Sequence, residues 1–291
     1  MRTSYRIPAP YAERFLKLAD AYVCDSPARP LRFIEKMKHN RGAVLAAQKG
    51  LDKNGLERKN PIIVALGDSV TAGHFEALLP KDPEDLRRIY EGYMAGEEPE
   101  TPTEITDARE SYIEKFRLAS IDKYEQTSVS VINAGIAGDV LPMMFRRADR
   151  DVVRYDPDLV LINGSLNWDD ETMGDAKAYK ALLKGLVRKL KAETTADIIL
   201  LTPNGDLPND LLEPIGIPAK PVTTPARCEA IRELAREEQV CLADVRGVWD
   251  QAKDAGIPWK ALLSNGVNHP SVEGHEVYAR VLMKLFEEEK A

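Results

Sequence analysis

The chain has 291 residues and a formal net charge of −7, with hydrophobic residues making up 44% of it and charged residues 30%. This is the composition of an ordinary globular protein with a sizeable core, and the length fits one large α/β unit with an extension. Because the charge balance is acidic, the basic surface that tracks nucleic-acid phosphates is excluded, and we expect no nucleic-acid partner.

The N-terminal stretch Met1–Pro8 lacks the apolar core of a signal peptide. No later stretch has the roughly 20 apolar residues that are needed to cross a bilayer. We therefore expect a cytoplasmic protein with no membrane span. Cys24, Cys228 and Cys241 match no zinc or redox spacing, which predicts buried free thiols.

Residues 1–58 have a helical pattern, with apolar positions at three- and four-residue spacing over Tyr11–Tyr22 and Arg32–Leu51. We predict a packed helical N-terminal extension without chemistry of its own. A lid and a contact between copies in a homo-oligomer are the roles left open for it. The main domain then covers residues 59–291.

The stretch Pro61–Gly73 changes character within a few residues. Its apolar, β-branched run Ile62–Leu66 predicts a buried central strand, and Gly67 suits a tight exit from that strand. Ser69 would then lie at the carboxyl edge of a sheet, where open α/β folds bind their ligands. The alternative is that Asp68 or Ser69 only caps a short helix.

A segment rich in Glu, Asp and Pro follows at about 80–107. We predict a polar insertion that forms a solvated loop. Since it comes directly after the Ser69 stretch, it is also placed to overhang the carboxyl edge of the sheet.

Helix and strand patterns alternate beyond the insertion. We predict strands at 129–133, 159–163, 197–202 and 240–245, and helices at 108–124, 140–155, 175–193, 224–238 and 271–289. Together with the first strand, these make five strands separated by helices, which means parallel βαβ units. The predicted fold is a three-layer α/β/α, flavodoxin-like, doubly wound parallel sheet.

The run Ala-Leu-Gly-Asp-Ser-Val-Thr-Ala-Gly at 65–73 resembles the first sequence block of the GDSL esterases and lipases, the SGNH hydrolase superfamily. In that family the serine is the nucleophile and its own N–H helps to bind the oxyanion, which the resemblance carries to Ser69. The segment Asn133–Asp139 resembles the second block and puts Gly138 at the position whose N–H serves the oxyanion hole. The alternative for this segment is a plain strand-to-helix turn that Asp139 caps.

The third block is matched less closely. In the family an asparagine that follows a strand donates to the oxyanion, and the resemblance puts Asn167 in its place. Ser165 then stands where glycine is usual and Trp168 where aspartate is usual. Asn163 or Gly164 could be matched instead.

The last block, Leu263–His275, resembles the family segment that supplies the catalytic base, and His269 matches the histidine. Asn265 stands where the family has its aspartate. The partner of His269 is therefore this amide, or a backbone carbonyl, or a carboxylate from a neighbouring loop such as Asp206. For His74 and His275 we expect capping or core roles.

The resemblance implies hydrolysis of a small-molecule ester through an acyl-serine intermediate, with no metal or organic cofactor. Ser69 and His269 would be catalytic with Asn265 in the acid's place, and Ser69, Gly138 and Asn167 would form the oxyanion hole. A short-chain ester or a carbohydrate O-acetyl ester is the expected substrate. Two alternatives are kept: an impaired relative that binds an ester or glycan, and a flavodoxin-like binding domain.

Overall fold

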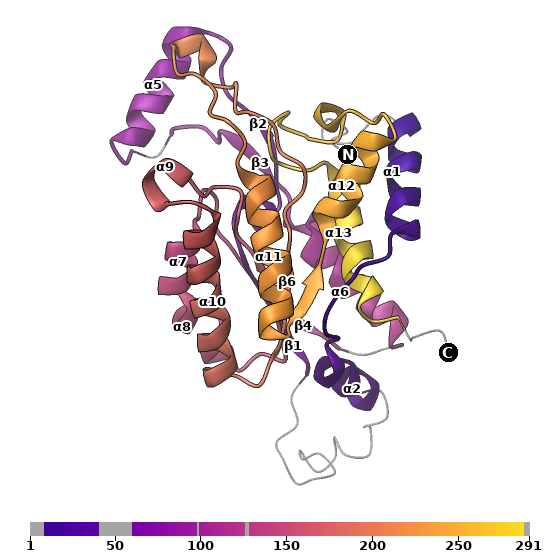
Figure 1. Cartoon of the computed structure of the whole chain (residues 1–291). Helices are drawn as coiled ribbons and strands as arrows, with labels where there is room; N and C mark the ends of the chain where they lie inside the picture. Colours follow the sequence, from indigo (N-terminus) through magenta and orange to yellow (C-terminus); the bar gives the residue numbers. More distant parts are fainter. Residues whose placement is uncertain (1–8, 41–59, 98, 126–127, 288–291) are drawn as a thin grey trace.

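A computed structural model describes residues 9–40, 60–97, 99–125 and 128–287 of the chain, in which helices enclose a parallel sheet on both faces (Figure 1). The strands of this sheet are β1 (Ile62–Gly67), β4 (Ser130–Gly135), β5 (Leu159–Asn163), β6 (Asp197–Leu201) and β7 (Cys241–Ala243). They lie in the order β4-β1-β5-β6-β7 and all neighbours are parallel. This is the flavodoxin-like doubly wound order, so the predicted fold class is confirmed.

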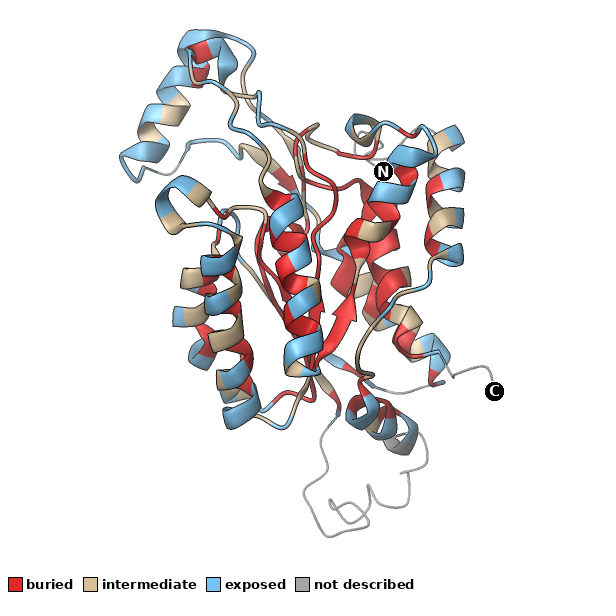
Figure 2. Cartoon of the chain, viewed as in Figure 1, coloured by how far each residue is buried: buried red, intermediate tan, exposed pale blue. Residues whose placement is uncertain are grey.

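The two faces of the sheet have separate cores because successive side chains of a strand point to opposite sides. In β5, Leu159 and Leu161 pack in one cluster while Val160 and Ile162 pack in the other. The first cluster is covered by α1 (Ala9–Ala21), α2 (Leu31–Asn40), α6 (Tyr112–Lys123), α12 (Val245–Asp254) and α13 (Val272–Lys284). The second is covered by α7 (Leu141–Arg146), α8 (Ala148–Asp151), α10 (Ala176–Glu193) and α11 (Thr224–Glu238). Figure 2 shows the buried residues concentrated in the strands and on the inward faces of these helices.

The N-terminal helices α1 and α2 share the larger core. Phe15 of α1 packs edge-to-face on Trp249 of α12, with ring centroids 5.2 Å apart. In α2, Phe33 packs on Phe286 in the same way at 6.0 Å, and its N–H donates to Asp197 at the start of β6 (2.8 Å). Helix α2 therefore lies at the amino ends of the strands, opposite to their carboxyl edge. The second half of the helical pattern predicted over Arg32–Leu51, from residue 41 onward, lies outside the described residues.

Two elements differ from the prediction in the second half of the chain. The helix expected over 140–155 is divided into α7, α8 and the 3₁₀ turn η2 (Val153–Tyr155). The strand expected over 240–245 ends at Ala243, and α12 begins at Val245. The buried residues of α12 include Val245, Val248 and Trp249, which have the three- and four-residue spacing of a helix that faces the core.

The segment expected to be a solvated loop is folded. It contains α5 (Pro83–Met94), which Asp82 caps by accepting the N–H groups of Glu84 and Asp85. It also contains β3 (Glu104–Thr106), which pairs antiparallel with β2 (His74–Ala77). We call this two-stranded sheet, in which α5 lies between β2 and β3 along the chain, the insertion hairpin. Helix α5 reaches across to the 3₁₀ turn η3 (Glu213–Ile215), where Arg87 donates to the Ile215 carbonyl (3.1 Å).

The three cysteines form no disulfide: Cys228 and Cys241 are buried, as predicted, and Cys24 is half-buried. Among the described residues, no helix combines the length and the apolar character that a bilayer span requires.

Replacement of Phe15 by alanine tests whether the N-terminal helices belong to the core. We expect Phe15→Ala to lower the free energy of unfolding by about 3 kcal/mol or more, because it empties a fully buried site against Trp249. Chemical denaturation with both far-UV and tryptophan signals measures this. Val23→Ala is the control, since Val23 is 86% exposed and its loss should change the stability by less than about 0.5 kcal/mol. If Phe15→Ala lowered the free energy of unfolding as little as Val23→Ala, the result would contradict a core shared by the N-terminal helices and the sheet.

Candidate active site

Ser69 begins α4 (Ser69–Ala72), a single helical turn directly after β1. The exit from the strand is tight: a Cβ on Gly67 would lie 2.0 Å from Thr71 Oγ1 and 2.8 Å from the Asn163 carbonyl, so only glycine fits. Asp68 caps the turn, with Oδ1 accepting the N–H of Val70 (3.0 Å). The capping role thus belongs to Asp68, and Ser69 is left at the carboxyl edge with 4% of its surface exposed.

His269 contacts Ser69 directly. Its Nε2 lies 2.9 Å from Ser69 Oγ and its Nδ1 lies 2.9 Å from the carbonyl oxygen of Phe75. Since a carbonyl only accepts, Nδ1 must carry the proton, and Nε2 of the neutral ring is then free to accept from the serine hydroxyl. His269 is buried, and this burial lowers its pKa from the ordinary histidine value.

Asn265 does not contact the His269 ring. Its Oδ1 accepts the backbone N–H groups of Val267, Asn268 and His269 at 3.0, 2.9 and 2.9 Å, and its Nδ2 donates to Asn268 Oδ1 at 2.9 Å. The side chain therefore fixes the shape of the loop that carries His269. The structure brings Ser69 and His269 together but puts the Phe75 carbonyl, not Asn265, against Nδ1.

Asp206, the other carboxylate considered for His269, also faces elsewhere. It accepts from Thr224 Oγ1 (2.6 Å) and from Arg246 (3.1 Å).

Gly138 lies in the turn after β4 with a positive φ of 69°, a backbone conformation that favours glycine. The side chain of Asn167 reaches this turn, and its Nδ2 donates to the Asp139 carbonyl (3.0 Å). Asp139 does not cap α7 as the alternative supposed, because α7 begins after Val140 and has no side-chain cap. The turn with Gly138 and the amide of Asn167 thus lie together at the carboxyl edge.

Arg147 is a buried residue that the sequence did not single out. Its guanidinium donates to Asp139 (2.7 Å), to the Gly67 carbonyl (2.9 Å) and to the Ala134 carbonyl (2.7 Å). It therefore ties the end of β1, just before Ser69, to the end of β4 and the Gly138 turn. Arg147 lies at the break between α7 and α8, the two parts of the helix expected over 140–155.

Asn163 and Asn167, the two candidates for the third block, have different surroundings. Asn163 is fully buried beside the hydroxyl groups of Tyr112 and Tyr278. Asn167 is half-buried and lines a surface hollow. Only Asn167 is therefore within reach of a bound ligand from solvent.

His275 and His74 also differ from each other. His275 is fully buried and its Nδ1 accepts the N–H of Tyr112 (3.1 Å), as expected for a core histidine. Burial lowers the pKa of His275 to about 3, so the ring is neutral. His74 is instead half-buried at the site: it is ion-paired with Glu104, and its ring centroid lies 6.1 Å from that of His269.

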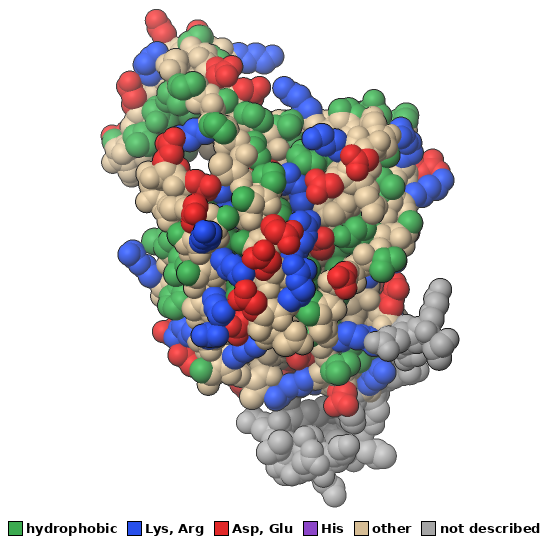
Figure 3. All heavy atoms as spheres, viewed as in Figure 1, with side chains coloured by type: hydrophobic (Ala, Val, Ile, Leu, Met, Phe, Trp, Pro, Cys, Tyr) green, Lys and Arg blue, Asp and Glu red, His purple; other side chains and the backbone are tan. Residues whose placement is uncertain are grey.

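A hollow of about 340 Å³ lies next to the Ser69–His269 pair. It reaches from Asn167 to Asn268, the neighbour of His269. It is walled by the residues after β5, by α9 (Asp170–Met173) and by residues 206–224, and the surface is hollowed between α5 and α9 (Figure 3). Charged groups of the wall pair with one another: Lys220 with Asp169 (2.8 Å) and Glu171 (3.2 Å), and Arg227 with Asp170 (2.6 Å). The uncharged polar side chains of the wall include the amides of Asn167, Asn209 and Asn268.

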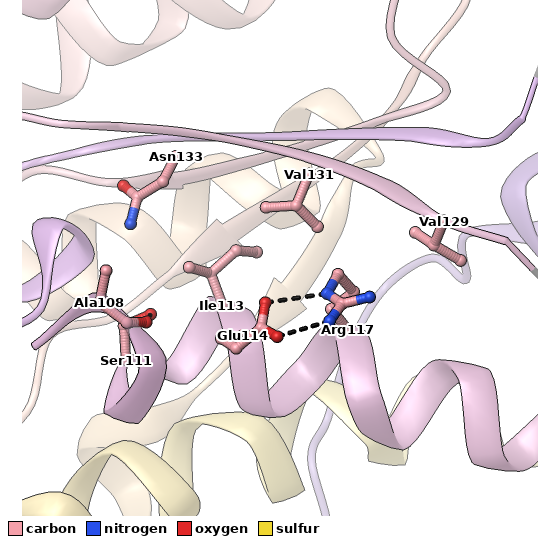
Figure 4. Close-up of a pocket in the computed structure, with 8 residues that line it drawn as sticks. All are labelled: Ala108, Ser111, Ile113, Glu114, Arg117, Val129, Val131 and Asn133. Carbon is pink, nitrogen blue, oxygen red and sulfur yellow. Dashed lines mark hydrogen bonds and ion pairs between the residues drawn. The ribbon is translucent and has the colours of Figure 1, made fainter.

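A second hollow of about 310 Å³ lies between the edge strand β4 and α6 (Figure 4). Val131 and Asn133 face Ile113 across it, and Glu114 and Arg117 pair with each other at 2.8 Å. Neither Ser69 nor His269 lines it. For metals, no cluster of three or more His, Cys, Asp or Glu side chains suited to an ion occurs within the described part of the chain.

Known proteins resemble this chain in sequence and in fold. Residues 65–277 match the profile of the GDSL-like Lipase/Acylhydrolase family. An acetylxylan esterase of Geobacillus stearothermophilus is 25% identical over 172 residues, which are 55% of this chain and 74% of the esterase. A crystal structure of an acetylxylan esterase from that organism has a TM-score of 0.52 at 20% identity and covers 78% of this chain and 95% of its own. An α/β hydrolase from the metagenome of Lake Arreo, Spain, has a TM-score of 0.54 at 20% identity, with 77% and 94% covered.

Asp68 gives the site a dependence of stability on pH. It is fully buried, its Oδ2 has no hydrogen-bond partner among the described residues, and burial, with Asp139 nearby, raises its pKa from 3.8 to about 7. Between these pH values the folded protein holds a proton that the unfolded chain has released. The contribution of Asp68 to stability is therefore complete below about pH 4 and is lost as the pH rises through about 7.

We expect Asp68→Asn to gain stability relative to the wild type as the pH is raised from about 5 to about 8, because the amide keeps the cap to Val70 and never becomes charged. Denaturant unfolding at several pH values measures the difference. Asp254→Asn, at an exposed position, is the control, and its difference from the wild type should be nearly constant. A pH-independent difference for Asp68→Asn as well would contradict the raised pKa.

Proposed function

We propose that this chain, which belongs to the GDSL-like lipase/acylhydrolase family, cleaves carboxylic esters through a covalent acyl intermediate on Ser69. Membership of the family makes it a carboxylic ester hydrolase. The observation that supports the covalent route is the 2.9 Å contact between His269 Nε2 and Ser69 Oγ. A serine hydroxyl is a weak nucleophile by itself and becomes an effective one beside such a base.

The proposed reaction has two halves. Ser69 Oγ attacks the ester carbonyl while His269 Nε2 takes the hydroxyl proton, and the tetrahedral intermediate collapses as the same proton passes to the leaving alcohol. Water then attacks the acyl-serine with His269 again as base. The second collapse releases the carboxylic acid and restores the Ser69 hydroxyl.

The oxyanion of both intermediates would be bound by the N–H groups of Ser69 and Gly138 and by the Asn167 side chain. Asn167 Nδ2 carries two hydrogens, and the bond to the Asp139 carbonyl uses only one of them. The second hydrogen supports the assignment of this amide as an oxyanion donor. Donors that are already held in place before the reaction stabilise the developing charge without reorganisation.

This chain differs from the acetylxylan esterase of G. stearothermophilus at the position of the catalytic aspartate. The G. stearothermophilus esterase has catalytic mutants described for a serine, an aspartate and a histidine, with the aspartate three positions before the histidine. In this chain the residue three positions before His269 is Gly266 and the one four before is Asn265, and neither has a carboxylate. We infer that the Phe75 carbonyl orients His269 in its place.

The hollow beside the pair supports a hydroxyl-rich alcohol as the other half of the substrate. Neutral amides donate to and accept from hydroxyl groups equally well, and Asn167, Asn209 and Asn268 line the hollow. The similarity to an acetylxylan esterase adds to this inference. A short-chain ester, in particular an O-acetyl group on a carbohydrate, is the proposed substrate class.

A second candidate is a relative that binds such an ester without turning it over. The absence of a carboxylate at Asn265 and Gly266 favours it. The fate of Ser69 separates this candidate from an enzyme.

Ser69→Ala tests the acyl-enzyme. We expect the wild type to hydrolyse chromogenic acetate esters, with a rate that falls as the acyl chain lengthens, and to take up one fluorophosphonate per chain. Both properties should be lost in Ser69→Ala, because Ser69 Oγ is the hydroxyl that lies against His269 in the described part of the chain. Intact-protein and peptide mass spectrometry identify the labelled residue. Labelling that survives in Ser69→Ala contradicts the assignment, and a wild type that binds acetylated xylooligosaccharides without cleaving them supports the second candidate.

Asn167→Ala tests the oxyanion hole. We expect kcat to fall by roughly 10²-fold or more with little change in KM, the usual cost of losing one side-chain donor to the oxyanion. Asn209→Ala is the matched control, since this exposed amide lines the same hollow and should change KM alone. Asn163→Ala should act through stability because Asn163 is fully buried. If Asn163→Ala showed the selective loss of kcat instead, Asn163 and not Asn167 would be the oxyanion donor.

A further inference from the structure

We propose that Glu104, held in place by His74, supplies the negative charge that stabilises the His269 imidazolium during catalysis. This inference rests on the proposed function and adds a positioning pair to the same site. Both residues belong to the insertion hairpin, outside the sequence blocks that resemble the family. The negative charge that an aspartate supplies in a Ser-His-Asp triad would thus come from the insertion hairpin and not from the loop before His269.

The geometry joins two contacts on one short pair of strands. His74 and Phe75 are consecutive in β2: the Phe75 carbonyl accepts from His269 Nδ1, and His74 Nδ1 pairs with the Glu104 carboxylate. Glu104 lies on β3, opposite Ala77, and the register is irregular between His74 and Ala77. Such an irregularity turns side chains away from their regular direction.

The hairpin is anchored against the core by the side chain of Phe75. This ring is fully buried and packs on the His275 ring with centroids 4.9 Å apart. The fixed ring holds the Phe75 carbonyl and the neighbouring His74 at constant positions relative to α13, the helix that begins just after His269. The imidazoles of His74 and His269 meet edge-to-face as a result.

The charge is needed because a carbonyl performs only half of the acid's task. The Phe75 oxygen orients the ring, but it has no net charge to balance the imidazolium that forms when Ser69 gives up its proton. The ionisable side chains on the elements around His269 include Asp68 on the turn before Ser69, His74 and Glu76 on β2, Glu104 on β3, and Glu273, His275 and Glu276 on α13.

Among these groups, Glu104 is the carboxylate whose charge raises the pKa of His269, and a positive charge on His74 acts in the opposite direction. Burial opposes the ionisation of Glu104, but the hydrogen bond from His74 and the attraction of the carboxylate to His269 and His74 in their protonated forms hold the pKa of Glu104 below its ordinary value. Burial lowers the pKa of His269, and the Glu104 carboxylate acts in the opposite direction. Asp68 has a pKa raised to about 7 and His275 one lowered to about 3, so neither is a fully charged partner at neutral pH.

The test is a pH titration of the His269 ring by nuclear magnetic resonance in histidine-labelled protein. The chain has four histidines, and the His269 signals are those missing from His269→Asn. In Glu104→Gln, which keeps the size and an acceptor for His74, we expect the pKa of His269 to fall by roughly half a unit or more. The acid limb of kcat/KM should move to lower pH by the same amount, with a lower plateau above it.

Charge and structure are separated by matched variants. Glu100→Gln removes the same charge from an exposed position of the insertion and should leave the pKa of His269 unchanged. Glu104→Asp, which keeps the charge, should titrate closer to the wild type than Glu104→Asn. If Glu104→Gln fails to fold, the comparison of Glu104→Asp with Glu104→Asn still shows whether the charge of this side chain acts on the pKa of His269.

The same pKa of His269 in the wild type and in the charge-removing variants overturns the proposal, whatever happens to the rate. A purely structural role of Glu104 would lower stability or kcat without moving this pKa. The titration requires no turnover, so a protein that fails the Ser69 test for ester hydrolysis still gives a result here. Failure of the positioning pair and failure of the proposed function are therefore distinguishable.

Discussion

The hydrogen bond from His269 Nδ1 to the Phe75 carbonyl determines what the rest of the site can do. It fixes the proton on Nδ1, so Nε2 faces Ser69 as an acceptor, and both contacts are 2.9 Å long. Two regions far apart in the sequence meet here: the continuous stretch from the turn after β1 into β2, which carries Ser69 and Phe75, and the loop before α13, which carries His269. The strand β2 is therefore part of the site, and β3 of the insertion pairs with it.

The carboxyl edge of the sheet is held together by polar groups that are themselves buried. Arg147 binds the ends of β1 and β4 and the turn that contains Gly138, so the proposed nucleophile and one side of the proposed oxyanion hole share a single anchor. Its ion pair with Asp139 is almost fully desolvated, and loss of either partner would leave an uncompensated charge in the interior. Catalytic geometry and folding stability therefore depend on the same residue.

The sequence predicted the elements whose pattern is local. The strand Leu159–Asn163 and the helix Thr224–Glu238 have the predicted bounds, because a continuous apolar run and a capped helical repeat are each visible within a few residues. Ser69 and His269 were found from their sequence blocks. The Phe75 carbonyl could not be found, because every residue has a carbonyl and only the tertiary fold selects one of them. Glu104 was hidden for a similar reason, since a hairpin between residues 30 apart brings it to His74. In contrast, the apolar spacing of α12 was present in the sequence and was overlooked.

The antiparallel pairing of β2 with β3 has a further consequence for how the molecule responds to heat. β3 is only three residues long, and it joins the two-stranded sheet, not the parallel one. Short, half-exposed strands open at a lower free energy than core strands, so the hairpin forms a unit that can open while the large sheet stays folded. Opening would withdraw the acceptor of His269 Nδ1 and allow the ring to change its tautomer. If this pair of strands opens first on heating, activity would be lost at a lower temperature than that at which the large sheet unfolds.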